Sequence, residues 1–271
     1  MRDIIIIGGG PAGVSAALTA KNRGKSVKII SNPYETSYLY KAALVENYPG
    51  LPNISGADML KTFREQIDQA DIEVINSRAL SAMYTGKGFS VAIGQDFSEC
   101  RALILAIGVL QQKTYPGESA LLGKGVSYCA TCDGMLYRGK KVALIGLMDG
   151  AEKEAEFLRS IGCTVEYFDK TTAKNMRILG DDKVSGIITD GVTHPVDGVF
   201  ILRSTIAPDS LIVGLEIENG HIVTDADLQT SVKGVFAAGD CIGRPYQIAR
   251  AVGQGNTAAL SACEFLDLLD K

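Results

Sequence analysis

The chain opens on a hydrophobic run that ends in a cluster of glycines. Asp3 to Ile7 is apolar after its first residue, Gly8 to Gly13 is glycine-rich, Val14 to Asn22 is rich in alanine, and Ser26 to Ile30 is mostly apolar again. This succession predicts a strand, a tight turn, a helix and a second strand. The beginning of the chain therefore predicts a βαβ unit.

A second stretch repeats the pattern. Val142 to Ile145 predicts a strand, Ala151 to Ser160 a helix, and Thr164 to Phe168 another strand. Two such units favour an α/β fold with two Rossmann-like domains. From Gly234 onward the chain returns to strand, glycine turn and helix. This tail indicates completion of the first domain, which makes the middle domain an insertion.

The length of 271 residues suits about two domains. We predict 1–115 and 200–271 as the two parts of a discontinuous domain, and 116–199 as a smaller inserted domain. The crossovers are predicted at 111–116, after an apolar strand that ends in Gly108, and at 200–207.

Composition narrows the class of protein. Hydrophobic residues make up 46% and charged residues 21%, as in ordinary globular proteins, and the net charge of -4 argues against nucleic acid as the main partner. The run of isoleucines at Ile4 to Ile7 is too short for a signal peptide or a membrane span. We therefore expect a cytoplasmic protein, in which a lasting disulfide framework is not expected.

The glycine turn at Gly8, Gly10 and Gly13 matches the G-x-G-x-x-G fingerprint between a strand and a helix. Its glycines permit a tight turn, close approach to a pyrophosphate and close helix packing, and the helix N-terminus favours the negative charge. The alternative is a glycine-rich turn without a ligand. The second strand ends at Ser31 and Asn32, without the acidic residue that usually holds a ribose.

A second strand-to-turn junction lies near the end of the chain. Gly234 to Asp240 predicts a strand that ends in Gly239 and Asp240, and a helix-like stretch follows from Gln247 to Leu269. Here Asp240 can accept a hydrogen bond from a sugar-like hydroxyl, and the start of the helix can polarise a carbonyl group. The alternative is an exposed turn aspartate.

The pair Cys129 and Cys132, followed by Asp133, carries the redox chemistry that we expect. Two cysteines at this spacing share one face of a helical turn and can close a reducible disulfide. At the start of a helix such a pair gains thiolate character, and Asp133 lies next to it for proton delivery. Zinc is the rival, but a structural site needs four ligands, and the only histidines are His194 and His221. The isolated cysteines are interpreted as small buried residues: Cys100, Cys163, Cys241 and Cys263.

Four segments together resemble the low-molecular-weight thioredoxin reductase family: 8–13, 46–50, 129–134 and 234–240. The resemblance implies FAD in the discontinuous domain, with Asn47 near the isoalloxazine and Asp240 near the ribityl and phosphate groups. It implies that Cys132 faces the flavin, that Cys129 attacks the partner's disulfide, and that Asp133 serves as the acid. The residues it assigns to FAD are Gly8, Gly10, Pro11, Ala12, Gly13, Asn47, Gly108, Gly239, Asp240, Gln247, Ile248 and Ala249.

The middle domain departs from that family, whose members carry a second glycine fingerprint for NADPH. Here the corresponding run is Gly146 to Ala151, with Met148 in place of the second glycine. Asp149, Glu152 and Glu154 add negative charge that repels a dianion. The following strand ends at Asp169 and Lys170 without the arginine pair; Asp169 leaves NADH as a weak option. We interpret the pyridine nucleotide site as lost.

Because the NADPH site is interpreted as lost, the sequence most resembles the ferredoxin-dependent flavin thioredoxin reductases, which form a pyridine-nucleotide-independent branch of the family. This implies thioredoxin as substrate, ferredoxin as electron donor and a homodimer. Two basic clusters are candidate docking surfaces for an acidic ferredoxin, with a solvated face as the alternative for each. They comprise Lys21, Arg23, Lys25 and Lys28, and Arg138, Lys140 and Lys141.

Two other functions remain open at this stage. One is an NADPH-dependent thioredoxin reductase with a degenerate nucleotide site. The other is an FAD-binding redox sensor in which the cysteine pair signals without turnover. For a reductase, the middle domain is expected to swing on its two crossovers, because a disulfide held against a flavin cannot also meet a protein substrate.

Overall fold

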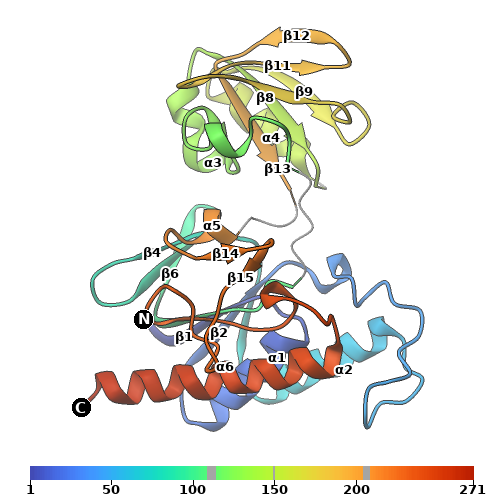
Figure 1. Ribbon diagram of the computed structural model, residues 1–271, viewed down its shortest axis with the longest axis vertical. Helices are drawn as coiled ribbons and strands as arrows, with labels where there is room; N and C mark the ends of the chain where they lie inside the picture. The colour runs from blue at the N-terminus through green and yellow to red at the C-terminus, as the bar shows by residue number, and fades with distance from the viewer. Residues whose placement is uncertain (109–113, 149, 204–207) are drawn as a thin grey trace. The chain divides into compact units, whose positions relative to one another are not determined.

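The computed structural model describes residues 1–108, 114–148, 150–203 and 208–271, apart from the side chains of Ser119, Cys132, Asp209 and Ser210. The chain forms two compact units (Figure 1). The split unit comprises Met1–Leu110 and Ala207–Lys271, and the inserted unit comprises Gln111–Ile206. Both have an α/β architecture with a parallel sheet, as the sequence predicts.

The boundaries of the inserted unit differ from the predicted limits of 116 and 199. Strand β13 (Gly198–Leu202) is fully buried and pairs in parallel with β8 (Lys141–Gly146), so residues 200–202 belong to the inserted unit. The predicted second crossover therefore began inside a strand. At the other end, Pro116 already accepts a hydrogen bond from the backbone of Ile178 within the inserted unit.

The split unit is built on one sheet in the order β3-β2-β1-β6-β5-β4, with β16 also paired to β6. Strands β4 and β5 form an antiparallel layer, and the others run parallel. Its strands are β1 (Arg2–Ile7), β2 (Val27–Ser31), β3 (Glu73–Asn76), β4 (Ala79–Tyr84), β5 (Phe89–Ile93), β6 (Asp96–Leu105) and β16 (Val235–Ala237). The hairpin of β14 (Ile217–Glu218) and β15 (His221–Ile222) forms a separate two-stranded sheet.

Helices α1 and α6 pack together beside this sheet, although most of the chain separates them (Figure 1). Alanine side chains on both helices are fully buried, which lets the two backbones approach closely. The helical segments of the split unit are α1 (Pro11–Asn22), η1 (Tyr34–Thr36), α2 (Gly56–Gln69), α5 (Pro208–Leu211), η4 (Asp240–Ile242) and α6 (Ile248–Leu269). In the described ranges, no helix combines the length and apolar character that crossing a bilayer requires.

The inserted unit has a parallel sheet of order β7-β13-β8-β9 and an antiparallel sheet of order β10-β11-β12. Its strands are β7 (Val126–Ser127), β8, β9 (Thr164–Asp169), β10 (Arg177–Gly180), β11 (Val184–Thr189), β12 (Val192–Pro195) and β13. Its helical segments are η2 (Ser119–Leu121), α3 (Ala130–Asp133), η3 (Gly134–Tyr137) and α4 (Ala151–Ser160). The predicted strand, helix and strand of this unit are confirmed as β8, α4 and β9.

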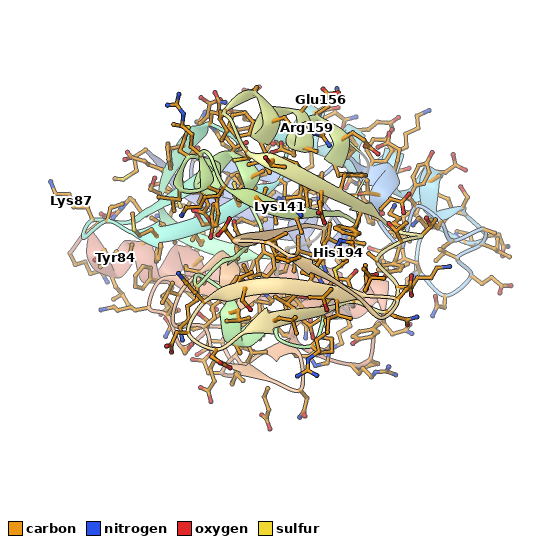
Figure 2. All side chains as sticks on the ribbon, turned by 90° about the horizontal axis from the view of Figure 1, so that it is seen from above. Tyr84, Lys87, Lys141, Glu156, Arg159 and His194 are labelled. Carbon is orange, nitrogen blue, oxygen red and sulfur yellow. The ribbon has the colours of Figure 1, made fainter. Side chains whose placement is uncertain are left out.

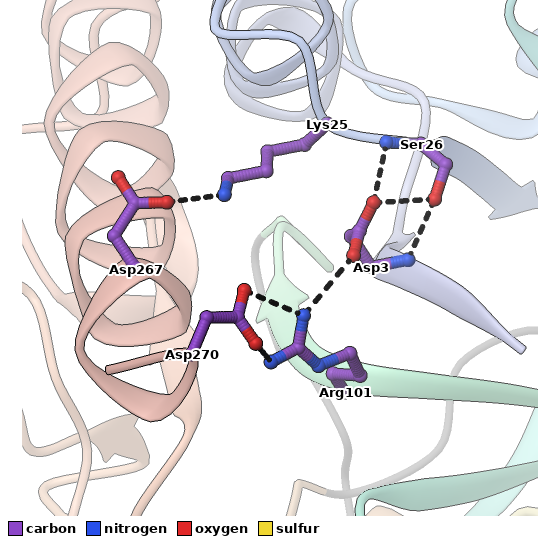
Figure 3. Close-up of polar contacts among 6 residues, drawn as sticks. All are labelled: Asp3, Lys25, Ser26, Arg101, Asp267 and Asp270. Carbon is purple, nitrogen blue, oxygen red and sulfur yellow. Dashed lines mark hydrogen bonds and ion pairs between the residues drawn. The ribbon is translucent and has the colours of Figure 1, made fainter.

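A polar network closes the end of the split unit away from the glycine turn (Figure 3). The Asp3 carboxylate accepts hydrogen bonds from the backbone N–H and the hydroxyl of Ser26, at 2.8 and 2.6 Å. Arg101 on β6 contacts both Asp3 and Asp270, which follows α6. Burial opposes ionisation of Asp3, but the hydrogen bonds from Ser26 and the charge of Arg101 outweigh it and lower the pKa of this carboxyl.

Asp3→Asn is expected to lower the free energy of unfolding by about 1.5 kcal/mol at pH 7, because it removes charge-assisted contacts. A carboxyl whose pKa is lower in the folded state stabilises the protein above its unfolded pKa, and this contribution is lost as pH falls through the folded value. Urea unfolding of the two proteins should therefore show a gap at pH 7 that closes toward pH 3. The control is Asp96→Asn, at an exposed aspartate; an equal loss there would contradict the assignment.

Candidate functional site

The glycine turn of the split unit is shaped for close approach of a ligand. A Cβ at Gly8 would lie 2.1 Å from the carbonyl oxygen of Ala106, and one at Gly13 would lie 1.9 Å from that of Gly8. Glycine is therefore required at both positions to close the turn. At Gly10, by contrast, a Cβ would meet none of the described atoms within 4 Å. Because Gly10 has no side chain, open space is left directly before α1, where a helix N-terminus favours a phosphate.

Ser31 stands where an acidic residue was expected, and it closes the turn instead. Its hydroxyl oxygen accepts a hydrogen bond from the N–H of Gly9 at 3.0 Å. A small pocket that is partly open to solvent lies beside it at the carboxyl ends of β2 and β3. Its polar lining includes Ser31, Asn32, Arg64 and Asn76. Asn76 was missed from the sequence, although it ends a strand that lies next to β2.

Two residues assigned to FAD, Asn47 and Gln247, are brought together. The side-chain amide of Asn47 donates a hydrogen bond to the side-chain oxygen of Gln247 at 3.0 Å. Gln247 is the N-cap residue of α6, and Ile248 and Ala249 begin its first turn. A contact between residues 200 positions apart fixes the loop around Asn47 against the start of this helix.

Asp240 lies at the predicted turn after β16 and is half-buried. Gly239 before it has a φ of 85°, and its N–H donates to the side-chain oxygen of Gln254 at 3.0 Å. Burial raises the pKa of the Asp240 carboxyl, and the positive charge of Arg250 opposes this rise. The Arg250 guanidinium also donates to the carbonyl oxygens of Gly243 and Pro245. Arg250 was not predicted, because its contacts depend on the path of the loop that carries Gly243 and Pro245.

Gly108 follows β6 with a φ of 73°, a conformation that favours glycine. A Cβ there would again meet no described atom within 4 Å. The remaining predicted contacts, Pro11 and Ala12, form the first turn of α1. These positions follow β1, β6 and β16 or lie at the starts of α1 and α6, and their binding of a dinucleotide stays a prediction.

In the inserted unit, Cys129 lies directly before α3 and is disulfide-bonded. The side chain of Cys132 lies outside the described residues, so the Cys129–Cys132 pairing stays a prediction. Ser127 organises this segment: its hydroxyl accepts from the N–H of Cys129 at 3.1 Å and donates to the Asp133 carboxylate at 2.7 Å. Asp133 is therefore held beside the redox segment by a residue that the sequence analysis missed.

The remaining cysteines are buried free thiols, as predicted. Burial raises the pKa of Cys100 and Cys241 to about 12, and it also raises the pKa of Cys163 and Cys263. A thiol with a raised pKa is a poor nucleophile. Across the described ranges, no three His, Cys, Asp or Glu side chains converge as a metal site requires.

The second glycine turn is closely packed at its first glycine, Gly146, which corresponds to Gly8. A Cβ at Gly146 would lie 2.4 Å from the hydroxyl oxygen of Tyr167, which donates to Glu152 at 3.0 Å. Burial and this hydrogen bond raise the pKa of Tyr167 to about 12. Met148 packs against the hydrophobic core of the unit. Met148 stands at the position that corresponds to Gly10, so this turn carries a side chain where the first turn has open space. The acidic Glu152 beside it also disfavours a pyrophosphate.

Asp169 is engaged in a local turn. Its Oδ1 atom accepts hydrogen bonds from the backbone and hydroxyl groups of Thr171 and Thr172. These hydrogen bonds, that of the Thr171 hydroxyl foremost, lower the pKa of this carboxyl. The Asp169 carboxylate thus has hydrogen-bond partners within its own turn and needs no ribose hydroxyl, which weighs against NADH as a ligand. Asp149, the other acidic residue of interest here, lies outside the described residues.

The first predicted basic cluster is largely neutralised. Lys25 pairs with Asp267 and Lys28 with Glu73, while Lys21 donates to the backbone oxygen of Asp71. In the second cluster, Lys141 binds one oxygen of Glu166, and His194, which is not part of the cluster, contacts the other oxygen; both residues are labelled in Figure 2. These contacts lower the attraction that either cluster offers to an acidic partner.

An open dinucleotide cradle in one α/β unit and a disulfide-bonded cysteine in the other define a two-unit disulfide oxidoreductase. The model of one family, described as pyridine nucleotide-disulphide oxidoreductase, matches residues 2–172 and 165–255. The chain belongs to this family.

Comparison with individual relatives narrows the type of oxidoreductase further. A thioredoxin reductase of Listeria innocua is 33% identical over 310 residues, covering 98% of this chain and 94% of the relative. A crystal structure of a ferredoxin-flavin thioredoxin reductase from Clostridium acetobutylicum is 37% identical, with 100% and 99% of the two chains covered and a TM-score of 0.89. An atypical thioredoxin reductase from Desulfovibrio vulgaris Hildenborough is 27% identical, with 99% of each chain covered and a TM-score of 0.74. The chain is thus a flavoprotein disulfide reductase of the thioredoxin reductase type.

Proposed function

We propose that this protein passes electrons from reduced ferredoxin through FAD and a Cys129–Cys132 disulfide to thioredoxin. One contrast carries the proposal: the first glycine turn is open at Gly10, whereas Met148 places a side chain at the equivalent position of the inserted unit. One nucleotide cofactor therefore fits the chain where a pyridine-nucleotide-dependent enzyme needs two. Similarity to the ferredoxin-flavin enzyme of Clostridium acetobutylicum supports the choice of donor.

The residues of the split unit fit FAD. The open space at Gly10 and the start of α1 would take its pyrophosphate, and Asp240 would accept a hydrogen bond from its sugar-like chain. Asn47, held by Gln247, would lie at the isoalloxazine. Bound FAD supplies a centre that accepts electrons singly and delivers them as a pair.

The cysteine pair carries out the exchange with thioredoxin. After the Cys129–Cys132 bond is reduced by two electrons, the Cys129 thiolate attacks the thioredoxin disulfide, forming a mixed disulfide and releasing one thioredoxin thiolate. Asp133, held by Ser127, gives a proton to that leaving sulfur. The Cys132 thiolate then attacks Cys129 of the mixed disulfide, which releases the second thioredoxin sulfur and restores the original bond.

Anaerobic mixing with alternative donors tests the proposal directly. Reduced ferredoxin is expected to bleach the flavin absorbance within the turnover time, because electron transfer from a docked protein needs no nucleotide site. NADPH and NADH are expected to leave the absorbance unchanged on that timescale. A pyridine-nucleotide-dependent flavoprotein reductase serves as the control for active NADPH. Rapid bleaching by NADPH would establish the pyridine-nucleotide alternative, and failure to sustain thioredoxin reduction with any donor would favour a redox sensor.

The same resemblance leads us to infer a cytoplasmic homodimer in which the inserted unit swings between the flavin and thioredoxin. A swing explains how one disulfide serves two partners that need the same face of the sulfur atoms. Residues 109–113 and 204–207 of the two crossovers lie outside the described part of the chain.

A further inference from the structure

The inserted unit holds a buried ion pair that joins the two ends of its chain. Glu118 follows the first crossover and Arg203 directly follows β13, before the second crossover. Their contact is bidentate, with guanidinium nitrogens 2.6 and 2.8 Å from the two carboxylate oxygens. Glu118 is 0% exposed and Arg203 is 8% exposed. The proposed chemistry uses neither residue.

Two tyrosines extend this pair into a cluster. The Tyr128 hydroxyl donates to Oε1 of Glu118 at 2.9 Å, and the Tyr115 N–H donates to Oε2 at 2.8 Å. The Arg203 guanidinium also lies over the Tyr115 ring, 5.4 Å from its centroid. Each carboxylate oxygen thus accepts two hydrogen bonds, so the geometry at Glu118 is tightly specified.

The cluster is attached to the redox segment through Tyr128. Tyr128 directly precedes Cys129 and lies between it and Ser127, whose hydroxyl contacts both the Cys129 backbone and Asp133. The entering chain is fixed as well: Pro116 accepts a hydrogen bond from Ile178, and a Cβ at Gly117 would lie 2.3 Å from the Ile178 carbonyl oxygen. One carboxylate therefore connects the start of the unit, its end and the segment that carries Cys129.

Stability alone gives little reason for such a cluster. Well-packed hydrophobic residues of similar volume stabilise a core as well as a buried ion pair does, because taking two charges out of water is costly. A buried pair is retained more readily where it specifies one geometry, and here that geometry concerns the only two chain connections of the inserted unit.

We propose that Glu118, Arg203 and Tyr128 are positioning residues that hold the two ends of the inserted unit and the Cys129 segment as one body, and thereby set how the disulfide is presented for reduction. The inference rests on the proposed function. In that step the S–S bond breaks, and two electrons and two protons from reduced FAD yield two thiols and oxidised FAD. The orientation of the inserted unit determines the position of the sulfur atoms only if the ends of the unit and the Cys129 segment move together as one rigid body.

Tyr128→Phe removes one hydroxyl from the cluster and leaves the ion pair in place. The flavin is photoreduced without oxygen, and new thiols are counted by rapid quenching. Formation of thiols is expected to slow about tenfold, because small misplacements of reacting groups have large effects on rate. Turnover should fall with an unchanged KM for thioredoxin, and FAD content and Tm should stay near wild-type. Tyr167→Phe is the matched control, since it also removes a tyrosine–glutamate hydrogen bond from the inserted unit; it should react at the wild-type rate.

The ion pair is tested with Glu118→Leu/Arg203→Met, because Glu118→Gln alone leaves a buried charge unpaired and can prevent folding. The double variant is expected to fold, to bind FAD and to slow thiol formation at least as much as Tyr128→Phe. Small-angle X-ray scattering should show a broader range of arrangements of the two units. Wild-type rates and scattering in both variants, or equal slowing in Tyr167→Phe, would overturn the inference. A wild-type protein that forms no thiols refutes the proposed function instead, and scattering still decides the role of the cluster.

Discussion

Cys132→Ser is expected to accumulate as a covalent complex with thioredoxin. With serine at position 132, Cys129 is a free thiol that attacks the thioredoxin disulfide, and no neighbouring thiolate is left to resolve the mixed disulfide. Most of the protein should shift to the summed mass of the two partners on a non-reducing gel, whereas the wild type should show a trace. Intact mass spectrometry and cleavage by dithiothreitol identify the bond.

The matched variant Cys129→Ser separates the roles of the two sulfurs. The resemblance places Cys132 toward the flavin, so this variant is expected to trap little thioredoxin. Cys163→Ser changes a buried thiol that the exchange does not use, and it should behave like the wild type. Efficient trapping through Cys132, or none through Cys129, would reverse or remove the assignment.

Gly10→Val is expected to give a folded protein that does not retain FAD. A side chain here enters the space that a pyrophosphate needs, yet its Cβ meets no described protein atom within 4 Å, and the φ of -80° suits any L-residue. The Kd for FAD should rise by on the order of a hundredfold, equivalent to about 2.8 kcal/mol. The measurements are flavin absorbance after gel filtration and circular dichroism of the same sample.

Substitutions at two further glycines serve as controls for this prediction. Gly253→Val places the same side chain on α6, where its Cβ also meets no described atom within 4 Å outside the backbone of the helix itself, and FAD should be retained. Gly13→Ala forces a Cβ to within 1.9 Å of the Gly8 carbonyl oxygen, so we expect loss of the fold itself. If Gly10→Val bound FAD normally, the dinucleotide would have to lie elsewhere.

Elements with strong local patterns were predicted well from the sequence. The isoleucine run became β1, and the Ala-rich stretch after the glycines became α1, extended to include Pro11. The repeat in the middle of the chain gave β8, α4 and β9 within one or two residues of their predicted limits. In each case the spacing of apolar residues and the positions of glycines predict the strand or helix from the local sequence alone.

Features that depend on distant contacts were missed. The apolar run at Gly198–Leu202 was cut by the predicted crossover, because only its pairing with β8 shows that it continues the inserted sheet. Tyr167 reaches Gly146 and Glu152 only when β9 lies beside β8. Arg250 and Asn76 likewise join the site through the fold. The side chain of Cys132, on which much of the proposed chemistry depends, lies outside the described residues.

The order of elements along the chain has a consequence for biosynthesis. Strand β16 pairs with β6, and α6 packs on α1, although both follow the inserted unit in sequence. Because a ribosome makes the chain from its N-terminus, the inserted unit has its full set of strands before the split unit receives its last one. Until residues 235–237 are made, the Leu103–Leu105 edge of β6 lacks this partner, and Asp240 and the start of α6 come later still. If FAD binds at the proposed site, its loading is therefore expected late in the maturation of the nascent protein.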